Sequence, residues 1–180
     1  FPHHENEIEQ SVCAHGGQNI ARYWLHNGFV NVNKRKMEKS QGNTQVVHEL
    51  LQQSKCEVLR YLLLSAHYRQ PLDWAEEALT RVHSTADRIS GVLRDAAGRF
   101  GRFEAAQQPS ASFMSALLDD LNTPDALAEL NSGARRLANA DNAEDARLAA
   151  GELLAAGALI GLFQQDPQEW LAGDTEGLDD

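Results

Sequence analysis

From residue 44 onward, apolar residues recur at intervals of three and four, which is the spacing of one face of an α-helix. The first such helix would begin with Thr44 as its N-cap, and a second would follow Cys56 and end before Pro71. Asp73 opens an Asp-x-x-Glu capping arrangement in front of a long amphipathic helix that we expect to end at Gly98. The pattern therefore predicts a mostly helical protein beyond residue 44.

Three further helices are expected after residues 99–111, whose composition is that of a loop. One would cover residues 113–121, and the next would have Thr123 as its cap with proline in its first turn. The last would begin near Asn142 and continue to about Phe163. The last two helices are rich in alanine, which predicts close, coiled-coil-like packing in a bundle.

The first 43 residues have a different pattern of apolar and polar positions. A helix would begin near Pro2 and end at the glycine pair formed by Gly16 and Gly17. Aromatic and β-branched residues then flank Asn27 and Gly28, which predicts two short strands joined by a tight turn at that dipeptide. We therefore expect a short segment of mixed strands and helix in front of the bundle.

The first predicted helix carries a possible metal site. His3 and Glu7 stand four residues apart, so a helix places both side chains on one face, and both are of types that zinc accepts. They make only half of a zinc site, because no third or fourth ligand is evident nearby. The alternative is that they belong to a polar first turn, where acidic side chains suit the helix dipole.

A basic loop follows the second predicted strand. In residues 36–43, Lys36 and Lys39 lie three apart beside Ser40, and Gly42 and Asn43 come next. Ammonium groups and backbone N–H donors in such a loop can surround a polyphosphate and offset the charge on a leaving phosphate. A solvated basic turn is the more common explanation for a loop of this kind.

Composition narrows the class of protein. The chain has 180 residues, 42% hydrophobic and 23% charged, which is typical of a globular protein with a real core. A net charge of −10 argues against a protein that coats nucleic acid, although it leaves room for a local basic contact. Two cysteines are too few for a disulfide scaffold, so we expect a cytoplasmic protein. No apolar run suggests a membrane span, and the start at Phe1, without methionine, suggests a piece of a longer protein.

Several ordered segments resemble the cysteinyl-tRNA synthetases, a family of class I aminoacyl-tRNA synthetases. They are FPHHENE at 1–7, YWLHNGFV at 23–30 and KMEKSQGN at 36–43, followed by EVLRY at 57–61, SAHYRQPL at 65–72 and LDDLNTP at 118–124. Their order and spacing match the family, and together they extend the resemblance to about Phe163.

The resemblance implies an α/β remnant, the C-terminal part of a Rossmann-type catalytic domain, followed by a mostly α-helical bundle. Residues 1–44 would be the end of the catalytic domain with its signature lysine loop, and residues 45–105 a stem-contact segment and long helix. Residues 106–165 would form the helical domain, and residues 166–180 an acidic, loosely ordered tail. The first half of the catalytic domain and the anticodon-binding end would lie outside this chain.

The resemblance also implies an activity: ATP-dependent activation of cysteine and its transfer to tRNA(Cys), by a monomer. His3 and Glu7 would be two of four zinc ligands, with the remaining ligands outside this chain. Lys36 and Lys39 would be the catalytic residues at the triphosphate of ATP, which is bound with Mg, and Ser40 would also bind ATP. Because part of the site is missing, we expect these 180 residues alone to be inactive.

Two positions depart from the family pattern, and two other functions remain open. Glu38 stands where the loop normally has serine, and Gln41 replaces an expected leucine. A carboxylate there can pair with either lysine and repel ATP. The alternatives are a ligase that joins cysteine to an amino sugar in mycothiol synthesis, and a truncated non-catalytic paralogue that binds tRNA or protein.

Overall fold

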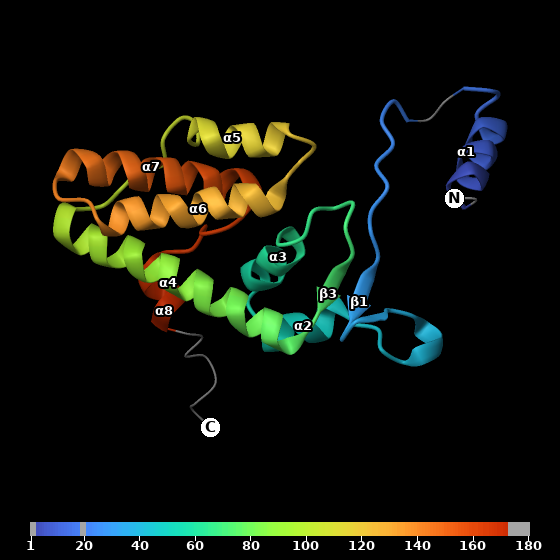
Figure 1. Cartoon of the computed structure of the whole chain (residues 1–180), viewed down its shortest axis with the longest axis horizontal. Coiled ribbons are helices and arrows are strands. Elements are labelled where there is room, and N and C mark those ends of the chain that lie inside the picture. Colours follow the sequence, from blue (N-terminus) through green and yellow to red (C-terminus); the bar gives the residue numbers. More distant parts are fainter. Residues whose placement is uncertain (1–2, 19–20, 173–180) are drawn as a thin grey trace.

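The structure, a computed structural model, describes residues 3–18 and 21–172. Most of the chain beyond residue 55 is a helical bundle (Figure 1). Its helices are α3 (Cys56–Leu64), α4 (Glu76–Phe100), α5 (Ala111–Leu118), α6 (Thr123–Ala138), α7 (Ala143–Ile160) and α8 (Pro167–Ala172). Two further α-helices, α1 (His3–Ala14) and α2 (Val47–Gln53), precede it. The expected mostly helical bundle after a partial α/β segment is thereby confirmed.

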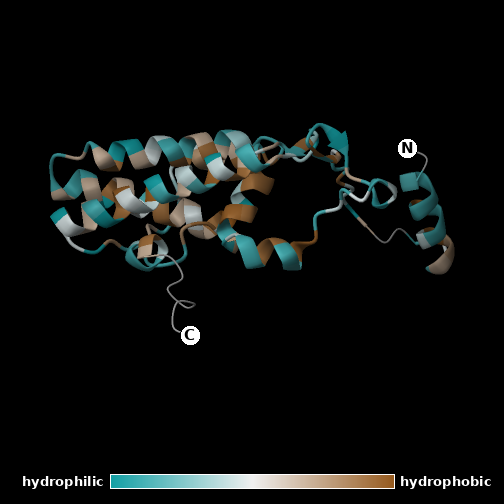
Figure 2. Ribbon diagram, turned by 90° about the horizontal axis from the view of Figure 1, so that it is seen from below, coloured by the Kyte–Doolittle hydropathy of each residue, from teal (hydrophilic) through white to brown (hydrophobic). Residues whose placement is uncertain are grey.

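The core of the bundle is built from the predicted leucine and alanine positions. Leu130 and Leu137 of α6 are buried, and Ala134 of α6 and Ala146 and Ala150 of α7 have no exposed surface. Small side chains let helix axes approach closely, which is why the alanine-rich pair packs tightly. Apolar residues lie between the helices, and most residues of the outer faces are hydrophilic, although Leu118 and Leu148 are exposed (Figure 2).

A small sheet connects the bundle to the lysine loop. Its strands are β1 (Val30–Val32), β2 (Arg35–Lys36) and β3 (Leu72–Trp74), in the order β2-β1-β3. β1 pairs antiparallel with β2 and parallel with β3. The hairpin turn is formed by Asn33 and Lys34, which have φ of 51° and 64°, as a tight hairpin turn requires.

The hairpin turn was expected at Asn27-Gly28, and that prediction is wrong. Residues 21–29 are extended instead, without forming a strand. The backbone at Gly28 lies close to the backbone at Gln70, since a Cβ placed on Gly28 would be 2.3 Å from the carbonyl oxygen of Gln70. A long-range backbone contact, which sequence pattern does not reveal, therefore overrides the turn propensity of Asn-Gly.

Two predicted helix caps are also wrong. Asp73 lies in β3, and its Oδ1 accepts a hydrogen bond of 2.7 Å from the backbone N–H of Lys34. The N-cap of α4 is Ala75, and the N-cap of α2 is Val46 rather than Thr44. Asp73 stabilises the hairpin turn, so its side chain serves the sheet instead of the helix behind it.

The caps of the later helices are asparagines. Asn122, and not Thr123, caps α6 by accepting a hydrogen bond of 3.2 Å from the N–H of Asp125. Asn142 caps α7 in the same way, as the pattern suggested. The helix expected over 113–121 begins at Ala111 and ends at Leu118, so the prediction was displaced by two or three residues.

Helix α8 fills the part of the chain where a loose tail was expected. Trp170 is 3% exposed, and its Nε1 donates a hydrogen bond of 2.8 Å to Asp87 of α4. The ammonium group of Lys55 lies over the Trp170 ring and donates to the Trp170 carbonyl. Residues 173–180 of the predicted tail lie outside the described residues, as do Phe1 and Pro2.

Helix α1 lies apart from the bundle (Figure 1) and buries none of its residues. It ends at Ala14 before Gly16 and Gly17, both with positive φ, as the sequence predicted. The ring of His4 stacks on that of His26 with centroids 4.4 Å apart. No helix among the described residues is long and apolar enough to cross a membrane.

Candidate functional site

The lysine loop, residues 36–43, is closed by the side chain of Asn43. The amide oxygen of Asn43 accepts a hydrogen bond of 2.9 Å from the N–H of Glu38, and its amide nitrogen donates to the carbonyl of Lys36 at 3.1 Å. Between them a 3₁₀ turn covers Lys39–Gln41 and ends at Gly42, whose φ of 65° favours glycine. The Asn43 side chain therefore closes the loop by bonding to its backbone at both Lys36 and Glu38. Lys39 and Ser40 are exposed on this closed loop.

Within the lysine loop, Glu38 makes polar contacts with both Lys36 and Ser40. Its carboxylate forms an ion pair of 3.3 Å with Lys36, and its second oxygen accepts a hydrogen bond from the Ser40 hydroxyl at 3.5 Å. The Lys36 ammonium also lies 4.9 Å from the centre of the Phe29 ring. Lys39 forms no ion pair within the described part of the chain. The two lysines therefore differ: one is held by Glu38, and the other is available to a ligand.

His3 and Glu7 lie on α1, both exposed and one turn apart on the same side of the helix. An imidazole and a carboxylate in this arrangement are suitable donors for zinc. Residues 3–18 and 21–172 contain no group of three or more histidine, cysteine, aspartate or glutamate side chains that could hold a metal ion. The two side chains thus offer two donors to a site that needs further ligands.

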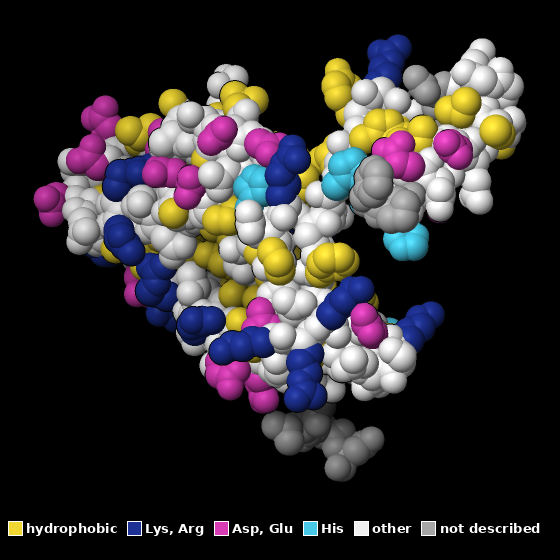
Figure 3. All heavy atoms as spheres, turned by 45° about the vertical axis from the view of Figure 1, so that its right-hand side comes forward, with side chains coloured by type: hydrophobic (Ala, Val, Ile, Leu, Met, Phe, Trp, Pro, Cys, Tyr) yellow, Lys and Arg dark blue, Asp and Glu magenta, His cyan; other side chains and the backbone are white. Residues whose placement is uncertain are grey.

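The lysine loop and α1 stand at the same end of the molecule. Figure 1 shows both beyond the small sheet, on the side away from the bundle. In the space-filling view, a recess separates the lobe containing α1 from the lobe containing the hairpin (Figure 3). Histidine side chains lie on the first lobe beside acidic and basic ones, and several lysine or arginine side chains lie on the second lobe.

A cluster around Asp120 joins the two segments, 65–72 and 118–124, that carried part of the resemblance. The carboxylate of Asp120 accepts hydrogen bonds of 2.7 Å from the Tyr68 hydroxyl and from Nε of Arg69. The bonds from Arg69 and Tyr68 lower the pKa of the Asp120 carboxyl, and the bond to Asp120 raises the pKa of the Tyr68 phenol. Sequence reasoning missed this contact, because residues 51 positions apart leave no periodic signal.

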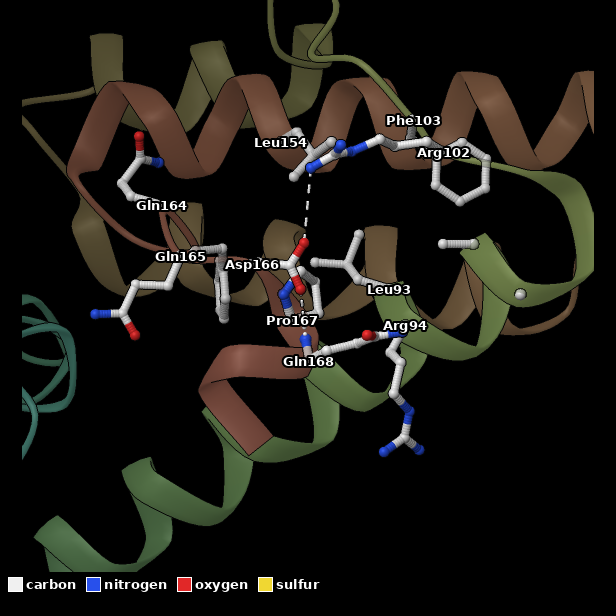
Figure 4. A pocket seen from close by; sticks show the side chains of 13 residues that line it. Leu93, Arg94, Arg102, Phe103, Leu154, Gln164, Gln165, Asp166, Pro167 and Gln168 are labelled. Atoms are coloured by element: carbon white, nitrogen blue, oxygen red, sulfur yellow. Dashed lines mark hydrogen bonds and ion pairs between the residues drawn. The ribbon is translucent and has the colours of Figure 1, made fainter. Parts of the chain in front are cut away.

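A hollow of about 570 Å³ lies at the other end of α4, between α4, α7 and the segment before α8 (Figure 4). Its apolar lining includes Leu93, Phe103 and Leu154. At its mouth, Arg102 reaches toward Asp166 with a nitrogen–oxygen distance of 3.7 Å. This hollow is remote from the lysine loop, so we do not assign it to the candidate site.

Comparisons with known proteins agree with the geometry of the chain. Residues 1–84 match the family described as tRNA synthetases class I (C) catalytic domain, and residues 112–164 match the DALR domain. The chain is 50% identical over 182 residues to a cysteine–tRNA ligase of Xanthomonas campestris, covering the whole chain and 38% of that relative. It is 52% identical to a cysteine–tRNA ligase of Maricaulis maris, covering 94% of the chain and 36% of the relative. The chain therefore spans well under half the length of these relatives.

Proposed function

Because the chain belongs to the cysteinyl-tRNA synthetase family, we propose that it is the part of a cysteine–tRNA ligase that carries the lysine loop and the helical bundle behind it. The reaction would join cysteine to ATP, release pyrophosphate and pass the cysteinyl group to tRNA(Cys). One observation carries this proposal: the identity of 50% to a cysteine–tRNA ligase extends over the whole chain rather than over one motif. A shared loop alone would support only a class I synthetase.

The domain division that we propose follows the resemblance. Residues 1–44 would close the catalytic domain, residues 45–105 would contact the stem of the tRNA, and residues 106–165 would form the helical domain that supports tRNA binding. The match of residues 112–164 to the DALR domain supports the last of these assignments. In this arrangement the charge of tRNA would meet basic side chains locally, in a chain that is acidic overall.

Lys36, Lys39 and Ser40 would act on the triphosphate of ATP bound with Mg. Lys39 has an exposed ammonium group, so it can approach the pyrophosphate as negative charge builds up on it. Lys36 would first have to exchange its contact with Glu38 for one with a phosphate oxygen. That exchange is inexpensive, because an ion pair on an exposed surface contributes at most about 1 kcal/mol.

His3 and Glu7 would hold a zinc ion together with ligands from outside this chain. Their donor types fit two of the four positions of a tetrahedral site, and their common face on α1 lets both reach one ion. Bound zinc would supply a soft Lewis acid for the thiolate of cysteine, which a serine hydroxyl cannot match. The contribution of this chain is to orient the two donors on a single helix.

Cysteine-dependent ATP–pyrophosphate exchange by the full-length parent protein tests the proposal. We expect exchange with cysteine and not with serine, and we expect Lys39→Ala to lower its rate by about 100-fold, as does the loss of one group that stabilises developing charge. Arg35→Ala is the matched control, because it removes a cation from β2 outside the loop. The 180-residue chain alone should not catalyse exchange.

Two results would contradict the proposal. The first is exchange that does not depend on cysteine, and the second is equal rates in the Lys39→Ala and Arg35→Ala variants. Release of AMP in the presence of an amino sugar instead of tRNA would favour the mycothiol-type ligase. A parent protein that binds tRNA without any exchange would favour the non-catalytic paralogue.

A further inference from the structure

We propose that Asp120 is a positioning residue: it clamps the connecting strip, residues 66–74, and thereby fixes the hairpin that carries the lysine loop relative to the helical bundle. The effect on catalysis rests on the proposed function, whereas the clamp itself is a property of this chain.

The carboxylate of Asp120 receives three hydrogen bonds from the connecting strip. Besides the bonds of 2.7 Å from Tyr68 and from Nε of Arg69, Nη2 of Arg69 donates at 3.3 Å, so the guanidinium binds in a bidentate manner. His67 completes the arrangement, with its Nε2 4.0 Å from Asp120 and its ring stacked on Tyr68. Bidentate, charge-assisted contacts fix orientation as well as distance.

The backbone at Asp120 is held in an unfavourable conformation. Asp120 and Leu121 have φ of 52° and 55°, in the left-handed region that residues other than glycine rarely adopt. Such strain persists only where the surrounding structure determines it, and it clusters at active sites, ligand clamps and switch regions. Here the turn between α5 and α6 aims the carboxylate at the connecting strip.

The connecting strip is joined directly to the hairpin. The carbonyl of Tyr68 accepts a hydrogen bond of 2.6 Å from the N–H of Gly28, and the N–H of Leu72 donates to Phe29 at 2.9 Å. Beyond these bonds β3 pairs with β1. Among the described residues, every backbone or side-chain hydrogen bond that leaves residues 21–43 ends on residues 68–74.

The position of the lysine loop therefore depends on the strip, and the middle of the strip depends on Asp120. The strip continues into α3 at one end and into α4 at the other, which fixes its ends within the bundle. Tyr68 and Arg69, halfway along, are held by their side chains to Asp120 and by the Tyr68 carbonyl to Gly28. Loss of the carboxylate would free this part of the strip, and the hairpin would move with it.

Amide hydrogen exchange in the intact chain tests the clamp. In the Asp120→Asn variant, the Gly28 amide should exchange about five-fold faster, the factor that corresponds to loss of one well-oriented charged contact. The amide of Leu130, in the core of α6, should exchange at an unchanged rate. Asp119→Asn is the matched control, because Asp119 is the exposed neighbour of Asp120 and has no hydrogen-bonded side chain within the described residues.

A second variant separates the clamp from general stability. Asp120→Gly removes the carboxylate but also relieves the left-handed backbone at that position, so the bundle should lose no stability. The Gly28 amide should nevertheless exchange about five-fold faster, as in Asp120→Asn. Unchanged exchange at Gly28 in both variants, or equal acceleration in Asp119→Asn, would overturn the clamp.

The positioning role is tested by ATP–pyrophosphate exchange in the full-length parent. Asp120→Asn should lower kcat by about five-fold and leave the KM for ATP nearly unchanged. The reason is that a displaced loop would stabilise the transition state less well, while its binding of ATP in the ground state would change little. An unchanged kcat alongside faster amide exchange would overturn the positioning role. A parent that shows no cysteine-dependent exchange at all would refute the proposed function, while the amide-exchange result would still decide the clamp.

Discussion

The two halves of the molecule differ in how they are held together. The bundle, residues 56–172, has a continuous apolar core, whereas no described residue before Glu57 is buried. All of the candidate chemical groups, from His3 to Ser40, lie in the part without a core. Stability thus resides in one region and the proposed chemistry in the other, and a few hydrogen bonds through residues 66–74 connect them.

This difference explains why polar contacts matter more at the site than in the bundle. A fully buried apolar residue contributes about 1.5–3 kcal/mol by leaving water, and many such residues act together in the bundle. The hairpin lacks that contribution, because Val30 and Val32 of β1 are only half-buried, and the extended segment before it leaves Tyr23 exposed by 85% and Phe29 by 63%. Its position is therefore set by direction-dependent contacts, which determine geometry while adding little stability.

The largest effect should come from truncating the core. Phe113 of α5 is 1% exposed, so Phe113→Ala should lower the free energy of unfolding by about 3–5 kcal/mol, through lost burial and the cavity left behind. Tyr23→Ala removes an aromatic side chain of similar size that is 85% exposed, and should change it by less than about 0.5 kcal/mol. Urea unfolding measures both. Equal losses would show that the part before residue 56 has a core of its own.

A smaller and more local effect is expected where the extended segment meets the connecting strip. In Gly28→Ala the new methyl group would overlap the carbonyl of Gln70, so the two backbones must separate, at a cost of about 1–3 kcal/mol. The Asn33 amide, which donates to Trp74, should lose protection, whereas amides in the core of α6 should not. Hydrogen exchange at these amides is the measurement.

The matched control for this substitution lies in the bundle. Gly91 of α4 has open space where its Cβ would be, so Gly91→Ala should stabilise the helix by about 0.5–1 kcal/mol. If Gly28→Ala leaves the Asn33 amide as protected as Gly91→Ala does, the close approach of Gly28 to Gln70 does not hold the hairpin.

Sequence pattern was sufficient for the bundle because each helix buries a repeated face. The errors there concern caps and boundaries, as at Asn122, where neighbouring residues offer equivalent side chains, and the short helix α8, which forms where a loose tail was expected. In the hairpin, Asn27-Gly28 and Asn33-Lys34 are both plausible turns, and the close approach of Gly28 to Gln70 decides between them. Local pattern contains no information about a contact 42 residues away along the chain.

The same limit applies to the candidate site. The lysine loop was recognised because its residues are adjacent in sequence, and its closure by Asn43 is equally local. Contacts between distant residues were missed: Asp120 with Arg69, and the buried Glu57, whose carboxylate accepts hydrogen bonds from the backbone near Phe163. These are single polar contacts between distant residues, and no repeating sequence pattern predicts them.

The smallest effect that we predict concerns Glu38, and it tests whether the exposed site is governed by single contacts. Glu38→Ser removes the carboxylate that lies 3.3 Å from the Lys36 ammonium, and both side chains are partly exposed, by 39% and 55%. An ion pair of this kind contributes at most about 1 kcal/mol. Its removal should therefore increase the fraction of Lys36 that is free to bind phosphate by no more than about five-fold. The free energy of unfolding should change by less than about 0.5 kcal/mol.

Cysteine-dependent ATP–pyrophosphate exchange by the full-length parent, measured at low ATP, would show this gain. Glu49→Ser, which removes an exposed carboxylate from α2 outside the loop, should leave the rate unchanged. If Glu38→Ser also leaves it unchanged, then Glu38 does not compete with ATP for Lys36, and the loop tolerates a carboxylate at this position. A rate that falls would mean that the pairing of Glu38 with Lys36 and Ser40 orders the loop for catalysis, because the same carboxylate holds both side chains.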